Sequence, residues 1–129
     1  MPELPRPYEL LELGDGQVVE FHPRGYAEGA LRIFPTDWNA QVDDAVAKGR
    51  ITADQAVQAK RDGKLIPVLR VVVDSRDKPM GVPYWDVTST TLIPTLLPYL
   101  KDPAYKGKTF TVTAAGVGLK KRFVLVVKP

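Results

Sequence analysis

The sequence contains no cysteine and only one histidine, His22. Without thiols, disulfide bridges, thiolate metal sites and cysteine nucleophiles are excluded, and a cytoplasmic location is the natural expectation. One histidine leaves too few nitrogen and sulfur ligands for an ordinary zinc site. His22 is therefore interpreted as a partly exposed residue at the end of a strand, and no metal or cofactor is expected.

Long apolar runs are also missing. No stretch reaches the ~20 apolar residues that a membrane-spanning helix needs. The first residues, MPELPRPYELLELGDG, carry acidic side chains where a secretory signal would carry basic ones. Neither a membrane segment nor a secretory signal is expected.

Motifs for catalysis and phosphate binding are incomplete. Gly116-Val-Gly118 lacks the third glycine of a dinucleotide fingerprint, and a strand follows it instead of a helix. Gly107-Lys108-Thr109 resembles the end of a P-loop but has no glycine five positions earlier. The two serines, Ser75 and Ser89, fall at expected turns or helix caps, so no catalytic triad is indicated. These patterns predict a protein that is not an enzyme.

The 129 residues suit one domain with a real hydrophobic core, so residues 1–129 are expected to form a single domain. Prolines at positions 2, 5 and 7 predict that residues 1–7 are a loose N-terminal arm.

Positive charge gathers at the C-terminal end of the chain. The net charge is +3, but residues 101–129 contain seven Lys and Arg against one Asp, and residues 1–100 contain eleven against fourteen Asp and Glu. The first hundred residues therefore have a net charge of −3 and the last 29 a net charge of +6. This asymmetry indicates an anionic partner, or head-to-tail self-association.

Turn residues predict strands near the start. Leu10–Leu13 and Val18–Phe21 flank an Asp-Gly turn, which favours a β-hairpin, and Ala30–Phe34 predicts a short third strand.

The next segment has a helical period. A first helix is expected to start at Thr36 or Asp37 and to close at Gly49. Thr52-Ala-Asp-Gln55 has the form of a capping box and begins a second helix that ends at Gly63. Together they predict a helical hairpin.

Central strands are expected at Leu65–Asp74, which is rich in β-branched residues, and at Gly81–Val87. A third helix is expected to begin at Thr88 or Ser89, and its leucines repeat at three and four residues. The helix is expected to be short or kinked, because two prolines lie within it.

The chain closes with a hairpin of Thr109–Thr113 and Arg122–Val127 around a loop in which Gly116, Gly118 or both adopt positive φ. The order of elements predicts an α+β fold with a largely antiparallel β-sheet or a small barrel. It has N- and C-terminal hairpins, an inserted helical hairpin and one further short helix.

The leading functional hypothesis is a non-enzymatic nucleic-acid-binding protein that favours single strands. Exposed aromatic rings stack on bases while cations follow the phosphates. The candidate nucleic-acid-binding residues are Lys106, Lys108, Lys120, Lys121, Arg122, Tyr84, Trp85 and Tyr105. The alternative is a protein–protein interaction or structural accessory module of a larger assembly, with an acidic protein as its partner. If the cluster instead has no binding role, Trp85 packs under the third helix and the lysines keep a sheet edge soluble and unpaired.

Overall fold

The computed structural model describes residues 2–129 and contains two three-stranded antiparallel sheets with three α-helices. In chain order the elements are β1 (Val18–Phe21), β2 (Pro23–Ile33), α1 (Trp38–Ala47), α2 (Ala53–Asp62), β3 (Lys64–Val73), β4 (Tyr84–Val87), α3 (Leu92–Leu100), the 3-10 helix η1 (Pro103–Gly107), β5 (Thr109–Ala115), the 3-10 helix η2 (Gly118–Lys120) and β6 (Arg122–Lys128). The predicted α+β class is confirmed, and residues 2–129 form no closed barrel.

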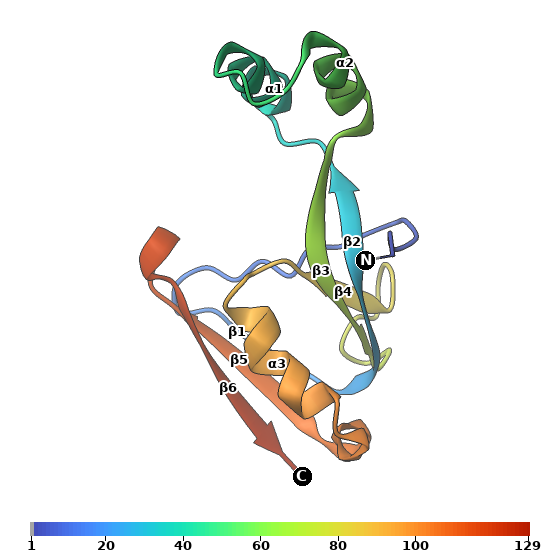
Figure 1. Ribbon diagram of the computed structural model, residues 1–129. Helices are drawn as coiled ribbons and strands as arrows, with labels where there is room; N and C mark the ends of the chain where they lie inside the picture. The colour runs from blue at the N-terminus through green and yellow to red at the C-terminus, as the bar shows by residue number, and fades with distance from the viewer. Residues whose placement is uncertain (1) are drawn as a thin grey trace.

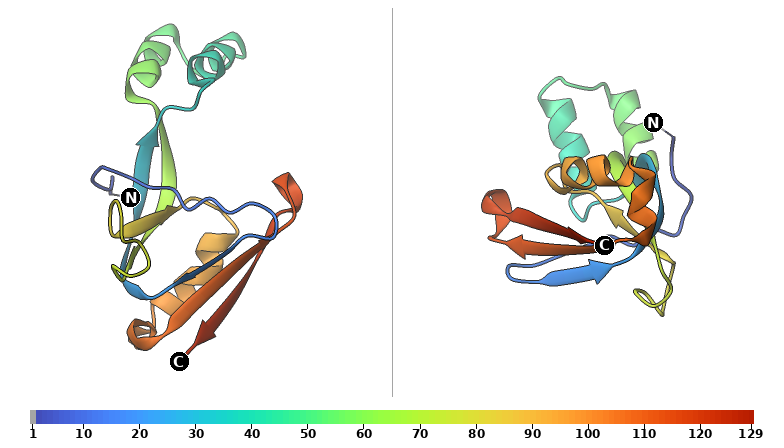
Figure 2. Two further views of the ribbon diagram at one scale, coloured as in Figure 1. Left: turned by 180° about the vertical axis from the view of Figure 1, so that it is seen from behind. Right: turned by 90° about the horizontal axis from the view of Figure 1, so that it is seen from below.

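The two sheets are ordered β1-β5-β6 and β2-β3-β4. The chain passes from the first sheet to the second at His22, the single residue between β1 and β2. Helix α3 lies between the sheets (Figures 1 and 2). The arrangement leaves one face of the β1-β5-β6 sheet turned away from α3.

The hydrophobic core fills the space between α3 and the two sheets. Helix α3 contributes three buried leucines at intervals of four residues, Leu92, Leu96 and Leu100. Both sheets supply apolar side chains to the same cluster, including Leu69 of β3 and Phe110 of β5, neither of which is exposed to solvent. The core therefore depends on contacts between segments far apart in the sequence.

The helical hairpin α1–α2 projects from the end of the long β2–β3 hairpin, away from the rest of the molecule (Figure 1). The predicted capping box at the start of α2 is confirmed: Thr52 and Gln55 exchange side-chain and backbone hydrogen bonds. A hydrogen bond joins the two helices: Nε1 of Trp38 in α1 donates to the carbonyl of Ala59 in α2 at 2.8 Å.

The N-terminal third differs from the predicted hairpin. The turn after Leu13 forms, with Gly16 at φ 78°, but β1 pairs with β5 and the segment Leu10–Leu13 forms no strand. Leu10 instead makes an isolated parallel bridge with Asp86 of β4. The reason is that each segment pairs with a strand far away in the sequence: β1 with β5, and Leu10 with β4. A turn pattern describes only neighbouring residues and cannot predict such partners.

Residues 2–7, for which the sequence predicts a loose arm, are hydrogen-bonded to the edge of β2. The Leu4 amide donates to the Ala30 carbonyl, and the Ala30 amide donates to the Pro2 carbonyl, each at 2.9 Å. Gly29 makes this close approach possible, because a Cβ at that position would lie 2.6 Å from the Pro2 carbonyl oxygen.

We expect Gly29→Ala to displace the arm, since the added carbon meets backbone that cannot rotate away. Hydrogen exchange should become faster at the Leu4 and Ala30 amides, while the amides of α2 keep their rates. Gly25→Ala is the matched control in the same strand, because its added Cβ meets only Val72 at 3.9 Å. Unchanged exchange at Leu4 in the Gly29 variant would contradict the prediction.

Candidate functional site

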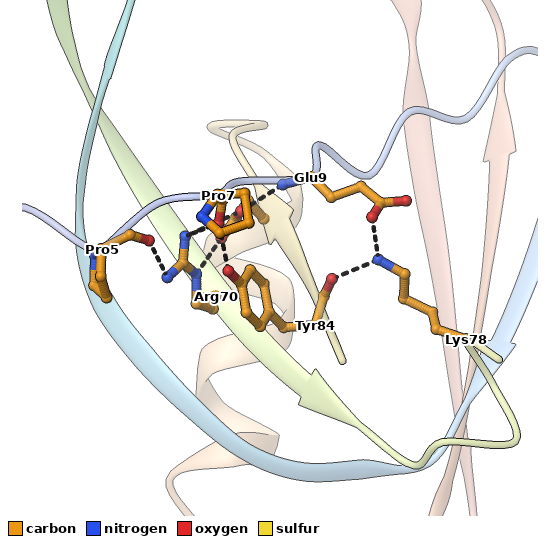
Figure 3. Close-up of polar contacts among 7 residues, drawn as sticks. Pro5, Pro7, Glu9, Arg70, Lys78 and Tyr84 are labelled. Atoms are coloured by element: carbon orange, nitrogen blue, oxygen red, sulfur yellow. Dashed lines mark hydrogen bonds and ion pairs between the residues drawn. The ribbon is translucent and has the colours of Figure 1, made fainter. Parts of the chain in front are cut away.

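Tyr84 and Trp85 of β4 point to opposite faces of their sheet, and each meets an internal partner. The Tyr84 ring lies 4.1 Å from the Arg70 guanidinium carbon, and its hydroxyl donates to the Pro7 carbonyl (Figure 3). Trp85 packs edge-on against Phe21, with ring centroids 6.1 Å apart. Both aromatics are therefore engaged in holding the fold.

Arg70 anchors the N-terminal arm to the β2-β3-β4 sheet. Its Nε donates to Asp86 Oδ1 at 2.8 Å, and its Nη1 donates to the Pro5 carbonyl at 2.7 Å (Figure 3). The same Asp86 carboxylate, which has no solvent exposure, accepts a hydrogen bond from the Glu9 amide. This buried ion pair joins β3, β4 and the arm.

The third aromatic of the predicted site is also internal. Tyr105, in η1, is only 6% exposed and packs edge-on against Tyr26 at 6.3 Å between ring centroids. Base stacking needs an accessible ring face. In this conformation Tyr105 presents none.

The C-terminal hairpin β5–β6 forms as predicted, and its loop has the expected glycine geometry. Gly116 and Gly118 both have positive φ, 86° and 58°. The Gly116 amide donates to Asp15 Oδ1 at 2.8 Å, and a Cβ on Gly116 would lie 2.7 Å from the Lys120 carbonyl oxygen. The loop is thus fastened to the turn that precedes β1.

The predicted cations fall into two groups at opposite ends of this hairpin. Lys106 and Lys108 lie beside the start of β5, which pairs with the end of β6 through Thr109 and Lys128. The other group, Lys120, Lys121 and Arg122, follows the loop at the far end. None of these five predicted cations forms an ion pair with a carboxylate within residues 2–129.

We define the outer face as the side of the β1-β5-β6 sheet that is turned away from α3. The pairing register places on it Val18 and Glu20 of β1, Thr109, Thr111, Thr113 and Ala115 of β5, and Arg122, Val124, Val126 and Lys128 of β6. Val18, Val124 and Val126 are 57%, 56% and 44% exposed. The outer face therefore presents three exposed valines among threonines and Glu20, with cations at both ends of β6.

A groove lies beside the loop between β5 and β6. It has a volume of about 850 Å³ and is formed by the segment Leu11–Gly14 with Gln17, the hydroxyl-bearing segment Thr88–Thr91, and the start of β6 with its preceding loop. Leu119, fully exposed, and Lys121, whose ammonium lies 5.7 Å from the centre of the Phe123 ring, border it. The groove is thus lined by both apolar and hydrogen-bonding side chains.

His22, the only histidine, is held by a carboxylate. Its amide and its Nδ1 lie 2.8 and 2.9 Å from the two oxygens of Asp77. Nearby, Asp74 accepts a hydrogen bond from the Arg24 side chain, and this bond lowers the pKa of the Asp74 carboxyl below its ordinary value. No group of three or more His, Asp or Glu within residues 2–129 is placed to hold a metal ion.

Sequence reasoning missed the exposed valines Val124 and Val126. The sequence feature that could have revealed them is the run Phe123–Val127, in which every residue is apolar. An edge strand with only one face on a core needs apolar residues only at every second position. Such a run predicts that both faces of the strand are covered, by the chain itself or by a partner. Within residues 2–129, other parts of the chain cover only the face of Phe123, Leu125 and Val127.

No helix within residues 2–129 is long and apolar enough to cross a membrane. Comparison of this chain with protein-family models, with curated proteins and with solved structures finds no match.

Proposed function

We propose that this protein is a non-enzymatic interaction module that binds an acidic protein partner through its C-terminal hairpin. The observation that carries the proposal is the outer face, where exposed valines lie between cations that have no carboxylate partner within residues 2–129. An apolar patch bordered by charge is typical of protein interaction sites. The proposal retains the cytoplasmic location expected from the cysteine-free sequence.

Single-stranded nucleic acid is the second candidate partner. The cations in and beside the hairpin that form no ion pair within residues 2–129 favour it, because phosphate binding needs positive charge that no carboxylate neutralises. They are Lys106, Lys108, Lys120, Lys121 and Arg122. The contacts of the predicted aromatics count against nucleic acid: Tyr105 is buried, and the partly exposed Tyr84 and Trp85 each pack against a side chain of the same chain. The outer face has no aromatic residue.

Two probes of equal charge distinguish the candidates: a single-stranded oligonucleotide and an acidic peptide in which glutamate and valine alternate. Binding of the peptide without comparable binding of the oligonucleotide supports the protein partner. The reverse result, with an affinity that falls steeply as salt rises, supports nucleic acid. If neither probe binds at low salt, the hairpin is not an anion-binding surface and the proposed function fails.

The triple variant Lys120→Glu, Lys121→Glu and Arg122→Glu should lose binding of whichever probe the parent binds, by well over tenfold, because three attractive charges become repulsive. Its free energy of unfolding should change by less than about 1 kcal/mol, since surface charges contribute little to stability. Fluorescence anisotropy measures the binding and urea titration the stability.

The matched control reverses three cations of the projecting helical hairpin and the adjoining strand, Arg50, Arg61 and Lys64. These residues are exposed and belong to α2, to the loop before it and to the start of β3. This end of the molecule projects away from the hairpin of β5 and β6 (Figure 1). This control has the same net charge as the triple variant and should bind nearly as well as the parent. Equal loss in both variants would mean that only total charge matters.

A further inference from the structure

Strand β6 is an edge strand: β5 occupies one side of it, and within residues 2–129 no strand pairs with the other side. Half of its backbone amides and carbonyls therefore point away from the sheet. Such an edge is a ready template for an added strand.

The side chains of β6 on the outer face have a symmetrical order. Arg122 and Lys128 lie at the two ends, and Val124 and Val126 lie between them. A strand added beside β6 would place its own residues directly opposite these four. Opposite charges favour such pairs and apolar residues suit valine, so the complementary pattern is acid–x–apolar–x–apolar–x–acid.

From this edge we infer that the partner contributes an extended acidic segment of that pattern, which adds to the β1-β5-β6 sheet as a fourth strand beside β6. The inference rests on the proposed function and specifies how the partner binds. The pattern reads the same in both directions, so it fits parallel and antiparallel addition. The two acidic residues are six positions apart, about 20 Å along a strand.

A second copy of the same chain does not fit this edge as well. Antiparallel pairing of two β6 strands in register would bring Arg122 and Lys128 of different copies together at both ends. Like charges directly opposite one another destabilise a strand pair. Nucleic acid fits the middle of the strand poorly, because Val124 and Val126 offer neither charge nor an aromatic ring.

The test uses a synthetic peptide with glutamate at both ends of the pattern and valine at its two apolar positions, together with two N-methylated forms. One form is methylated at the odd amides and the other at the even amides. In a strand, alternate amides point to opposite sides, so only one form loses the donors that face β6. We expect that form to bind at least tenfold more weakly, while the other binds like the parent peptide.

Two outcomes separate the mode of binding from the function. If both methylated peptides bind as well as the parent peptide, strand addition is wrong and the proposed function stands. If the unmethylated peptide does not bind while the alternating glutamate–valine probe does, the proposed residue pattern of the added strand is wrong. If neither binds, the proposed function and the inference fail together, and the cations of β6 serve only to keep an edge soluble.

Charge exchange provides an independent test on the protein itself. The double variant Arg122→Glu and Lys128→Glu should bind the glutamate peptide at least tenfold more weakly and should bind a peptide with lysine at both ends in its place. A reversal of Arg50 and Lys64 is the control with the same net charge, and it should keep the original preference. If the double variant does not bind the lysine peptide, residues 122 and 128 do not pair with the two end residues of the added strand, and that part of the inference is wrong.

Discussion

Replacing Arg70 with methionine is expected to lower the free energy of unfolding by about 3–5 kcal/mol. The methionine can occupy much of the volume, but Asp86 remains as a buried carboxylate that has lost its cation. The Pro5 carbonyl also loses the donor that holds it. Urea unfolding at neutral pH measures the change, and hydrogen exchange at the Leu4 amide reports whether the arm detaches.

The control for this prediction is the double variant Arg70→Met and Asp86→Leu. It removes both charges, so no uncompensated charge is buried, although the Glu9 amide loses its acceptor. Replacing a whole buried ion pair by apolar residues costs much less than breaking it. The double variant should therefore be more stable than the single variant. If the double variant is the less stable of the two, the ion pair is not the source of the effect.

Phe110→Ala is the second substitution with a large expected effect, a loss of about 3–5 kcal/mol in the free energy of unfolding. The Phe110 ring is fully buried, 5.7 Å from the Phe21 ring and 6.3 Å from the Tyr99 ring between centroids. It joins β5 to β1 and α3. Its removal leaves a cavity in the middle of the core, which the neighbouring side chains can fill only in part. Thermal and urea unfolding measure the loss.

Thr111→Ala is the matched control, since it is the next residue of the same strand but lies on the outer face. The free energy of unfolding of this variant should fall by less than about 1 kcal/mol, the range of strand propensities. A similar loss in the two variants would show that strand propensity, rather than core packing, dominates at β5.

Phe110→Ala also bears on the outer face. The valines of that face keep their register only if the inner side of the sheet is anchored, because alternate residues of one strand share a single backbone. Peptide binding at β6 is therefore expected to weaken together with stability in the Phe110 variant and to persist in the Thr111 variant.

Features that depend on neighbouring residues were predictable from the sequence alone. The capping box at Thr52, the positive φ of Gly116 and Gly118, and the hairpin of β5 and β6 all agree with the structure. Each of them is set by hydrogen bonds or steric limits within a few residues. The α+β class followed from the order of these local elements.

Tertiary structure alone decided how the strands are divided between two sheets. A turn signal joined Leu10–Leu13 to Val18–Phe21, yet β1 pairs with β5, which lies about ninety residues further along the chain. The N-terminal arm likewise finds its place through Arg70 and Ala30. Burial of apolar side chains and hydrogen bonds to distant backbone groups determine these partners. A pattern of neighbouring residues does not predict them.

The candidate site divides in the same way. The sequence by itself determined that positive charge gathers around the C-terminal hairpin, because charge is a property of composition. Only the tertiary structure decided that Tyr84, Trp85 and Tyr105 have internal partners and that Val124 and Val126 are left exposed on a free edge. Exposure depends on what packs against a side chain, and those contacts come from distant parts of the chain.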